Sequence, residues 1–242
     1  MVSNAQLASH TWRMELSGDT SAFARGGQFL DVALQGRFLR RPFAVQKWDG
    51  NSLVFLYRVV GEGTKQMTFI KEGDSLDLLT GLGNGFDASL CSRAALVVCG
   101  GLGASPVFPL VKELIEKGRK VYVVAGFNSA SEIILEDEMK ALGANVTIAT
   151  MDGSAGIKGL VTDAIASLPE LQRECDCLYT CGPRVMMKAV CGMLPQLPGE
   201  ASLEERMGCG CGICYGCTCH TEKGPARVCA DGPVFKVEDI IW

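Results

Sequence analysis

The sequence predicts a multidomain protein of the α/β plus β class: an antiparallel β-barrel, then a doubly wound parallel α/β domain, then a small cysteine-rich domain. Three observations predict this order. Short alternating apolar runs broken by glycine fill the first third of the chain. Nearly continuous apolar runs alternate with amphipathic segments after Ser92. Half of the 12 cysteines then fall between Cys209 and Cys229.

The composition narrows the class of protein before any motif is considered. Of 242 residues, 48% are hydrophobic and 21% charged, which excludes a disordered or fibrous chain. A net charge of −4 without a lysine or arginine block gives no indication of nucleic-acid binding. The uncharged stretch 94–111 approaches the length of a membrane span, but its glycines and prolines favour a turn, so no span is expected.

The balance of 12 cysteines against 2 histidines is unusual. The start of the chain, Met1–Gln6, lacks the basic and apolar regions of a signal peptide, which predicts a cytoplasmic protein. In that compartment cysteines serve metal or redox chemistry more often than structural disulfides.

The first predicted domain covers residues 1–88. Its run Leu53–Val60 is rich in the branched and aromatic residues that favour strands, and Gly61 and Gly63 end it. Gly26-Gly27 and Gly73-Asp74 are typical of turns, and no helical period stands out. These features predict an antiparallel sheet or small barrel.

The second predicted domain covers residues 89–198. Four short apolar runs are expected to be strands buried on both faces: Ala94–Cys99, Val121–Ala125, Val146–Thr150 and Cys177–Cys181. Between them, one helical face runs from Val107 to Ile115 and ends at Gly118, and a second includes Ile133, Ile134, Met139 and Leu142 before Gly143. Alternation of strand and helix predicts a parallel, doubly wound sheet.

The third predicted domain covers residues 199–242, after a linker at Leu194–Gly199. Within it, four cysteines have the spacing C-x4-C-x2-C with a distant fourth, which is the spacing of plant-type [2Fe–2S] ligation: Cys209, Cys214, Cys217 and Cys229. The glycines between them allow a tight loop whose backbone N–H groups reach the sulfurs.

Other interpretations of the cysteines remain open. Cys211, Cys214 and Cys217 match the start of a bacterial [4Fe–4S] run, which lacks here a fourth cysteine followed by proline. A structural zinc site also takes four thiolates, usually as two C-x2-C units, and disulfides or inert thiols are further alternatives. Cys219, like Cys211, has no assigned role. Five cysteines in or near apolar runs are expected to be buried packing residues: Cys91, Cys99, Cys175, Cys177 and Cys191.

Two further features carry little information by themselves. The turn Gly100–Gly103 follows a predicted strand and opens a helix, so it suits either a phosphate ligand or simple packing. Arg40 and Arg41 precede Pro42 and suit either a phosphate contact or a solvated surface. The turn at Gly61–Thr64 suits either a phosphate contact or a turn without a ligand.

The order of these features resembles that in a known family. Three segments resemble the flavin-binding barrel of the ferredoxin–NADP reductase superfamily: Arg41-Pro42, Leu56-Tyr57-Arg58 and Gly63-Thr64. Three more resemble its pyridine-nucleotide domain: Gly81–Phe86, Gly100–Gly103 and Cys181-Gly182-Pro183. The cysteine loop with its tail Val228–Phe235 resembles more narrowly the electron-transfer subunits of NAD-dependent dihydroorotate dehydrogenases, from about Gly27 to Trp242.

The resemblance implies roles for single residues. Contacts with FAD are implied for Arg41, Pro42, Phe43, Ala44, Leu56, Tyr57, Arg58, Gly63 and Thr64. Contacts with NAD are implied for Gly100, Gly101, Gly103, Cys181, Gly182 and Pro183. The family usually has Ser or Thr at the position of Ala44, so the flavin ring lacks one hydroxyl partner here and its tuning is expected to differ.

The resemblance also implies a function. A separate FMN-containing subunit would oxidise dihydroorotate, and this chain would pass the electrons through [2Fe–2S] and FAD to NAD, in a heterotetramer with two copies of each subunit. The only histidines, His10 and His220, offer no convincing proton-abstraction site, which agrees with carbon chemistry on a partner. Two alternatives are a subunit of an NAD(P)H:ferredoxin or sulfide-linked oxidoreductase, and a metal or redox sensor without enzymatic activity.

Overall fold

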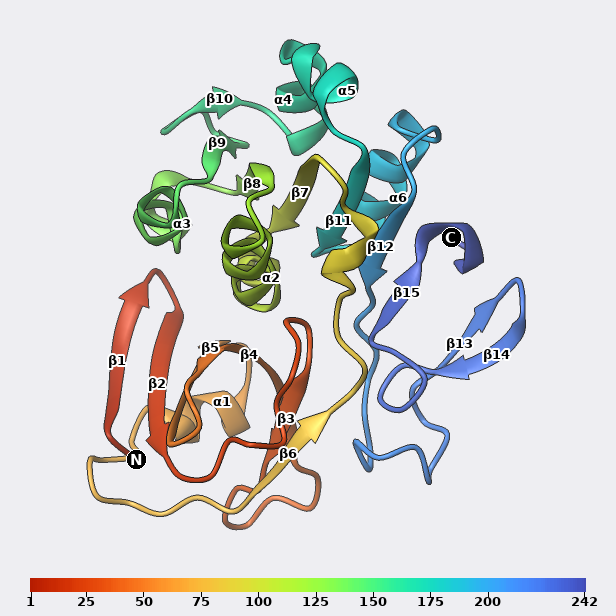
Figure 1. The fold of residues 1–242 in the computed structure, drawn as a ribbon. Coiled ribbons are helices and arrows are strands. Elements are labelled where there is room, and N and C mark those ends of the chain that lie inside the picture. Colours follow the sequence, from red (N-terminus) through yellow and green to blue (C-terminus); the bar gives the residue numbers. More distant parts are fainter.

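The computed structural model describes all residues from Met1 to Trp242, in two large β-sheets with a cysteine-rich segment beside them (Figure 1). Six antiparallel strands form the first sheet: β1 (Ser3–Ala8), β2 (Thr11–Ser17), β3 (Phe29–Val32), β4 (Arg41–Trp48), β5 (Ser52–Arg58) and β6 (Leu78–Leu82). Their order is β1-β2-β5-β4-β3-β6. Because β1 and β6 stand at the two ends of this order, backbone pairing does not close the sheet into a complete barrel.

The first sheet curls around its own apolar core. Met14, Leu30, Val45, Phe55 and Tyr57 are completely or almost completely buried there. Successive residues of a strand point to opposite faces, so only every second side chain enters this core. The other face of β4 and β5 is free to line a cavity.

A short helix in the first third differs from the sequence prediction, which found no helical period there. Helix α1 spans Glu62–Met67 and starts where the glycine turn was predicted. The Thr64 hydroxyl accepts the Val60 N–H at 2.9 Å and donates to the Gly61 carbonyl at 3.0 Å, which stabilises the first turn. Six residues are too few to reveal an apolar period.

Seven strands form the second sheet: β7 (Ala94–Gly100), β8 (Lys120–Phe127), β9 (Asn145–Thr150), β10 (Ile157–Lys158), β11 (Cys177–Cys181), β12 (Gly199–Ser202) and β15 (Val234–Lys236). Their order is β10-β9-β8-β7-β11-β12-β15, and all neighbouring pairs are parallel except the last. Five helices accompany this sheet: α2 (Ala104–Glu116), α3 (Glu136–Leu142), α4 (Val161–Ser167), α5 (Glu170–Glu174) and α6 (Arg184–Met193). The predicted strands and the parallel doubly wound arrangement are confirmed.

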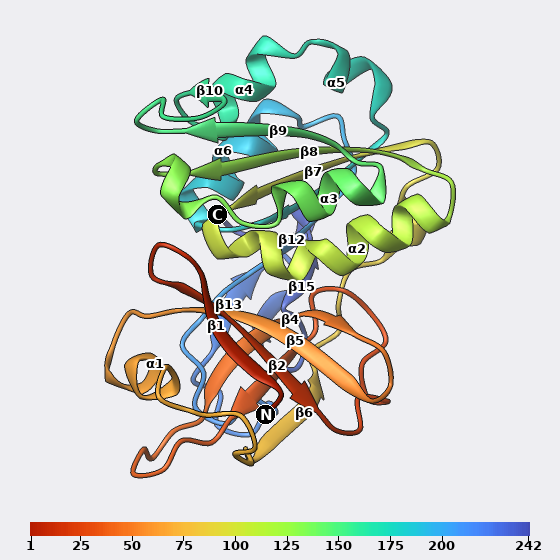
Figure 2. The same cartoon turned by 90° about the vertical axis from the view of Figure 1, so that its left-hand side faces the viewer.

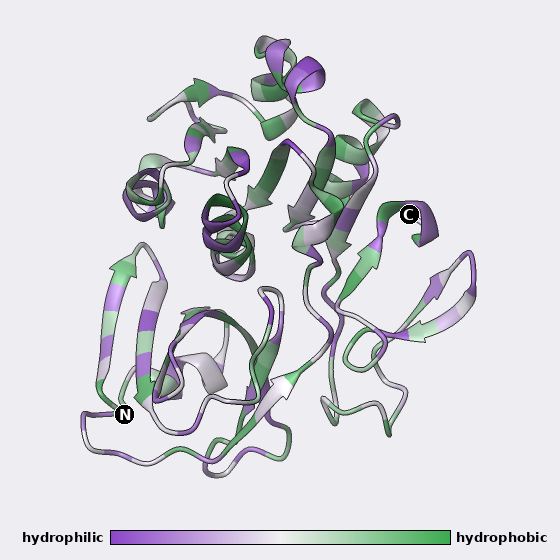
Figure 3. Ribbon diagram, viewed as in Figure 1, coloured by the Kyte–Doolittle hydropathy of each residue, from purple (hydrophilic) through white to green (hydrophobic).

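Apolar cores lie on both faces of the second sheet, as the continuous apolar runs require. Strand β7 is hydrophobic along its length, whereas β1 carries alternating hydrophilic and hydrophobic residues (Figure 3). Helix α3 is shorter than predicted, because Ile133 and Ile134 precede it in an extended segment and Leu135 has a left-handed backbone.

The sheet takes its last two strands from residues after 198. Strand β12 begins at Gly199 and pairs with β11, and β15 pairs with β12. Between them, the cysteine loop leads into a hairpin of β13 (Thr218–Thr221) and β14 (Gly224–Arg227). Figure 1 shows this hairpin to one side of both sheets.

Polar contacts join the two sheets. Arg13 of β2 forms an ion pair with Glu138 of α3 at 2.7 Å, and the Ser9 N–H donates to the Ser131 carbonyl. Figure 2 shows the β1–β2 hairpin reaching the level of α3 and α2. None of the helices combines the length and the apolar character that crossing a bilayer requires.

Candidate functional site

Two adjoining cavities lie where the two sheets meet. The larger has a volume of about 500 Å³ and the smaller about 340 Å³, both within the range of small-molecule sites. Arg58, Leu102 and Glu204 line both cavities. A ligand in one cavity is therefore next to a ligand in the other.

The smaller cavity gathers most of the residues predicted to contact flavin. Pro42, Phe43, Ala44, Leu56, Arg58 and Thr64 line it. Leu56 and Arg58 are two positions apart on β5, so their side chains leave the same face of the sheet.

Three of the predicted flavin residues do not line the cavity. Tyr57 points to the opposite face of β5, where its hydroxyl donates to Asn4 Oδ1 at 2.9 Å and burial raises its pKa to about 12. The Arg41 guanidinium donates to the Leu39 carbonyl at 2.7 Å. Gly63 lies against this guanidinium, since a Cβ there would be 2.9 Å from Arg41 Nε.

Arg58 connects the two sheets at the boundary of the cavities. Its Nη2 atom lies 2.8 Å from Glu132 Oε1, and Asn128 Nδ2 donates to the other oxygen of Glu132 at 2.9 Å. All three residues line the larger cavity. The ion pair thus presents a fixed guanidinium to both cavities.

The larger cavity lies at the carboxyl ends of the parallel strands β7, β8 and β11. Of the residues predicted to contact NAD, Gly100, Gly101, Gly103, Gly182 and Pro183 line it. The turn at Gly101–Gly103 continues directly into α2. Ligands of open α/β sheets bind at this edge, next to helix N-termini.

Gly103 is required for the close approach of two chain segments. A Cβ at this position would lie 2.2 Å from the carbonyl oxygen of Cys181. Cys181 itself is buried and lines the smaller cavity rather than the larger one. Burial raises the pKa of its thiol, which keeps it protonated.

The sequence analysis missed several cavity residues. The larger cavity also contains Gly126, Phe127, Asn128, Glu132, Met151, Leu160, Thr162 and Met186, and the smaller also contains Gly27, Ser105, Ser202, Leu203, Glu205 and Met207. Asn128 directly follows β8 and Met151 directly follows β9, while Gly126 and Phe127 end β8. Their position at the carboxyl ends of these predicted parallel strands was a usable signal.

Glu204 is the acidic residue at the contact between the cavities. Its side chain is open to solvent through the cavities, but the surrounding walls partly desolvate the carboxyl group and raise its pKa. Ser105, at the start of α2, has a buried hydroxyl oxygen without a hydrogen-bond partner in the wall of the smaller cavity. An unpaired buried polar atom is unusual, and a polar ligand in this cavity would satisfy it.

The cysteine loop directs backbone N–H groups at all four predicted ligand sulfurs. Cys209 Sγ accepts from Ile213 and Cys214 at 3.2 and 3.4 Å, and Cys229 Sγ accepts from Gly212 at 3.1 Å. Cys214 Sγ accepts from Gly216, and Cys217 Sγ accepts from Cys229, both at 3.4 Å. Such donors stabilise negative charge on thiolates, as cluster ligation requires.

Two of the predicted ligand sulfurs lie close together: Cys217 Sγ is 3.2 Å from Cys229 Sγ. Hydrogen bonds, first from the Cys214 N–H, lower the pKa of Cys209 to about 6, whereas burial raises that of Cys229 to about 12.

The loop shares a wall with the smaller cavity. Phe29 lines this cavity and packs in the same apolar cluster as Cys217 and Cys229. Met207, close to Cys209 in the chain, lines the cavity as well. A cluster in the loop would therefore lie beside a ligand of the smaller cavity.

The remaining cysteines have different surroundings. Cys211 is exposed in the loop and Cys219 is buried. The five cysteines predicted to pack in apolar regions are all buried: Cys91, Cys99, Cys175, Cys177 and Cys191. Cys91 and Cys177 also lie near Asp176, whose carboxylate accepts the Arg93 N–H at 2.8 Å and fastens the start of β7.

Two family models match the chain. The one described as the iron–sulfur cluster binding domain of dihydroorotate dehydrogenase B matches residues 204–241, and the oxidoreductase NAD-binding domain matches residues 97–192. The chain is 41% identical to a Bacillus pumilus protein named dihydroorotate dehydrogenase B (NAD(+)), electron transfer subunit, over 99% of this chain and 96% of that protein. A Fusobacterium nucleatum protein of the same name is also 41% identical, over 98% and 95%.

Solved structures show the same fold. The structure of an NADH-dependent reduced ferredoxin-NADP oxidoreductase matches with a TM-score of 0.88 and 29% identity, over 100% of this chain and 88% of that one. The FAD/NAD-binding domain of a Vibrio cholerae nitric oxide dioxygenase matches with a TM-score of 0.68 and 19% identity, over 82% and 95%. The fold is ferredoxin-reductase-like, and the chain belongs to the family of dihydroorotate dehydrogenase B electron transfer subunits.

Proposed function

We propose that the chain is an NAD-dependent oxidoreductase subunit that carries electrons released from dihydroorotate to NAD in pyrimidine biosynthesis. The observation that carries this proposal is the order of three sites in space. The thiol loop shares a wall with the smaller cavity, and the smaller cavity shares a wall with the larger one. The printed names of relatives at about 40% identity support the same role.

FAD belongs in the smaller cavity. The side chains of Pro42, Ala44, Leu56 and Thr64 would enclose it together with the backbone at Phe43, whose ring packs against Phe55 and Tyr57 on the core face of the sheet. The unpaired Ser105 hydroxyl would meet one of its polar atoms. Arg58 would contribute positive charge to its phosphates. Arg41, Tyr57 and Gly63 would act through the backbone or through packing, since none of the three lines the cavity.

NAD belongs in the larger cavity. Gly100, Gly101 and Gly103 bring backbone N–H groups and the start of α2 close to its phosphates. Gly182 and Pro183 would lie against the nicotinamide, with Cys181 behind them in the wall of the smaller cavity. Glu204, at the contact of both cavities, would face the region where the two cofactors meet.

The cysteine loop would bind a [2Fe–2S] cluster through Cys209, Cys214, Cys217 and Cys229. An iron–sulfur cluster exchanges single electrons, nicotinamide accepts a hydride, and flavin does both, so FAD stands between the other two. The chain contributes the N–H donors to the sulfurs and the shared wall beside Phe29.

The domain limits follow these cofactors: residues 1–88 form a barrel-like FAD unit, 89–198 the NAD unit and 199–242 the cluster unit. Strands β12 and β15 belong to the cluster unit in sequence and to the second sheet in pairing. This shared sheet would fix the cluster segment relative to the nucleotide.

The partner would be an FMN-containing subunit that oxidises dihydroorotate, in a heterotetramer with two copies of each chain. Ile213 and Tyr215 lie beside the cluster ligands with exposed fractions of 78% and 65%, which suits a docking surface. A cytoplasmic location suits the number of cysteines.

A second candidate is supported by the structural match to an NADH-dependent reduced ferredoxin-NADP oxidoreductase, which covers the whole chain. In that case the partner would be a larger subunit with several clusters. The identity of the co-purifying subunit distinguishes the two candidates.

Reconstitution with the partner tests the proposal. The loaded chain, mixed with an FMN-containing dihydroorotate-oxidising subunit, is expected to give NAD reduction that depends on dihydroorotate and on both proteins. A mixture that remains inactive with all cofactors loaded would contradict the assignment of the partner.

A further inference from the structure

Arg227 lies in the hairpin that follows the cysteine loop and contacts the loop through its guanidinium. It ends β14, two residues before Cys229, and its contacts gather around one carboxylate. Nε donates to Asp231 Oδ2 and Nη2 to Asp231 Oδ1, both at 2.9 Å, while the Arg227 backbone N–H also donates to Oδ2 at 2.8 Å. A two-pronged pair of this kind holds the guanidinium in one orientation.

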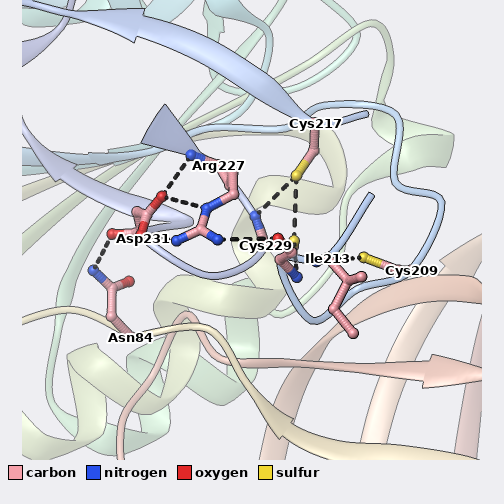
Figure 4. A network of polar contacts seen from close by, with 8 residues as sticks. Asn84, Cys209, Ile213, Cys217, Arg227, Cys229 and Asp231 are labelled. Atoms are coloured by element: carbon pink, nitrogen blue, oxygen red, sulfur yellow. Dashed lines mark hydrogen bonds and ion pairs between the residues drawn. The ribbon is translucent and has the colours of Figure 1, made fainter. Parts of the chain in front are cut away.

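The third nitrogen of the guanidinium, Nη1, contacts the cysteine loop. Arg227 Nη1 donates to the Gly212 carbonyl at 3.0 Å. The N–H of the same peptide unit belongs to Ile213 and donates to Cys209 Sγ at 3.2 Å. One peptide group therefore connects the guanidinium to a predicted ligand sulfur. Figure 4 shows Arg227 held by Asp231 and, farther along the loop, Ile213 in contact with Cys209.

A neighbouring contact strengthens this arrangement. The Gly212 N–H donates to Cys229 Sγ at 3.1 Å, so the peptide units on both sides of Gly212 serve ligand sulfurs. Gly212 has a φ of +85°, and a Cβ there would lie 2.8 Å from Ala230 Cβ and 3.2 Å from Arg227 Nη1. The absent side chain allows the loop to pack against Arg227.

The electrostatic consequence has a definite sign. A cation bound to a carbonyl oxygen polarises the peptide and makes its N–H a stronger donor. A stronger donor to a thiolate favours the cluster state with one more electron, which raises the reduction potential. The guanidinium remains charged at any working pH, so the effect does not depend on titration.

We propose that Arg227, oriented by Asp231, is a positioning residue that polarises the Gly212–Ile213 peptide towards Cys209 and thereby raises the reduction potential of the cluster. This inference rests on the proposed function, because it assumes that the loop binds a [2Fe–2S] cluster. The tyrosine ring of Tyr215, 5.2 Å from the guanidinium carbon, covers the same group.

Potentiometric EPR of the full chain, loaded with cluster and FAD, tests the proposal. Arg227→Gln is expected to lower the equilibrium constant for one-electron reduction of the cluster about tenfold, which corresponds to about 59 mV. Arg227→Lys is expected to lower it too, since an ammonium lacks the geometry to serve Asp231 and Gly212 together. Lys223→Gln removes one charge from the same hairpin, at an exposed ion pair with Asp239, and is expected to leave the potential unchanged.

Several outcomes would overturn the inference. One is an unchanged potential in Arg227→Gln with normal iron content, and another is a Lys223→Gln shift as large as that of Arg227→Gln. If Arg227→Gln loses its iron, Arg227→Lys, which keeps the charge but not the fork geometry, is measured instead, with a lowered potential expected. Loss of iron in that variant too, or an unchanged potential, would leave Arg227 with a purely structural role. Failure of the unmodified chain to assemble a two-iron cluster would instead refute the proposed function.

Discussion

The hydroxyl of Ser105 shows how a single residue can indicate a ligand. Its oxygen is buried, has no partner and lies in the wall of the smaller cavity. Nothing in the sequence around it distinguishes it from an ordinary residue in the first turn of a helix. Its meaning depends on the position of β4 and β5, which supply the opposite wall.

Ser105→Ala is expected to weaken FAD binding. Loss of one hydrogen bond is worth about 0.5–1.5 kcal/mol, so the dissociation constant should rise roughly two- to tenfold. Fluorescence titration of deflavinated chain with FAD measures the change. Ser167→Ala is the matched control, since its hydroxyl donates only to the Ala164 carbonyl within its own helix. Equal affinities for the two variants would contradict the placement of FAD.

Asp31 introduces a dependence on pH. It lies on β3 with an exposed fraction of 2%, its Oδ1 atom has no partner, and burial raises the pKa of its carboxyl group while Arg40 opposes the shift. Because the folded pKa exceeds the unfolded one, the stability linked to this proton is complete below the unfolded pKa of about 3.9 and is lost as pH rises through the folded pKa.

Asp31→Asn is therefore expected to raise the free energy of unfolding at pH 7 by about 1 kcal/mol, the order of cost of an unsatisfied buried group. The gain should shrink as the pH approaches 4. Urea unfolding at several pH values measures it. The exposed Asp137→Asn should change the free energy by less than about 0.5 kcal/mol at each pH. A gain independent of pH would show that Asp31 ionises freely.

At the scale of elements, the turn at Gly103 packs the start of helix α2 against the end of strand β11. The Gly103 Cα approaches the Cys181 backbone so closely that a Cβ would overlap its carbonyl oxygen. The Gly103 turn borders the larger cavity, and β11 leads directly into Gly182 and Pro183, which border it too, so the separation of the two segments helps to set its shape. Because the Cys181 carbonyl belongs to the backbone of a strand, it cannot rotate away from an added Cβ as a flexible side chain could.

Gly103→Ala is expected to destabilise the chain by about 1–3 kcal/mol, the usual cost of overpacking, and to raise the KM for NADH at least severalfold. Gly192→Ala is the matched control in helix α6, where nothing lies within 4 Å, and it should stabilise the chain by about 0.5–1 kcal/mol. Thermal unfolding and steady-state dye reduction measure both effects. Similar behaviour of the two variants would contradict the close packing of this turn.

Strands were the elements that sequence patterns predicted best. The boundaries of β11 match the apolar run Cys177–Cys181, because a strand buried on both faces leaves a continuous apolar signature. Helix α1 escaped prediction because it is only six residues long. The sequence up to Gly199 resembled a linker, and strand β12, which begins at Gly199, was not predicted. Its pairing with β11 depends on a strand that is distant in the sequence, so it leaves no local pattern.

The site residues divide along the same line. The spacing of the cysteines alone indicated the predicted cluster ligands, whereas the glycine turn at Gly100–Gly103 was a weak signal by itself and gained its predicted role from the family resemblance. Tyr57 was predicted to contact flavin together with Leu56 and Arg58. Successive side chains of β5 alternate between the two faces of the sheet, so Tyr57 points into the core instead. Glu132, Ser105 and Glu204 reach the cavities only because separate segments converge, which no local pattern records.

For the whole molecule, the order of sites is the main result. The thiol loop adjoins the smaller cavity through Phe29, and the smaller cavity adjoins the larger through Arg58, Leu102 and Glu204. The ion pair between Arg58 and Glu132 holds the two sheets together at this junction. Electron transfer between a one-electron partner and NAD requires such a continuous sequence of sites.

Anaerobic titration of the isolated full chain with NADH, followed by absorption and EPR spectroscopy, tests this central claim most directly. The account predicts about two irons and one FAD per chain, loss of flavin absorbance as NADH is added, and an EPR signal of a reduced [2Fe–2S] cluster. A chain that contains zinc or a four-iron cluster, or whose flavin is reduced by NADH while the cluster stays oxidised, would contradict it.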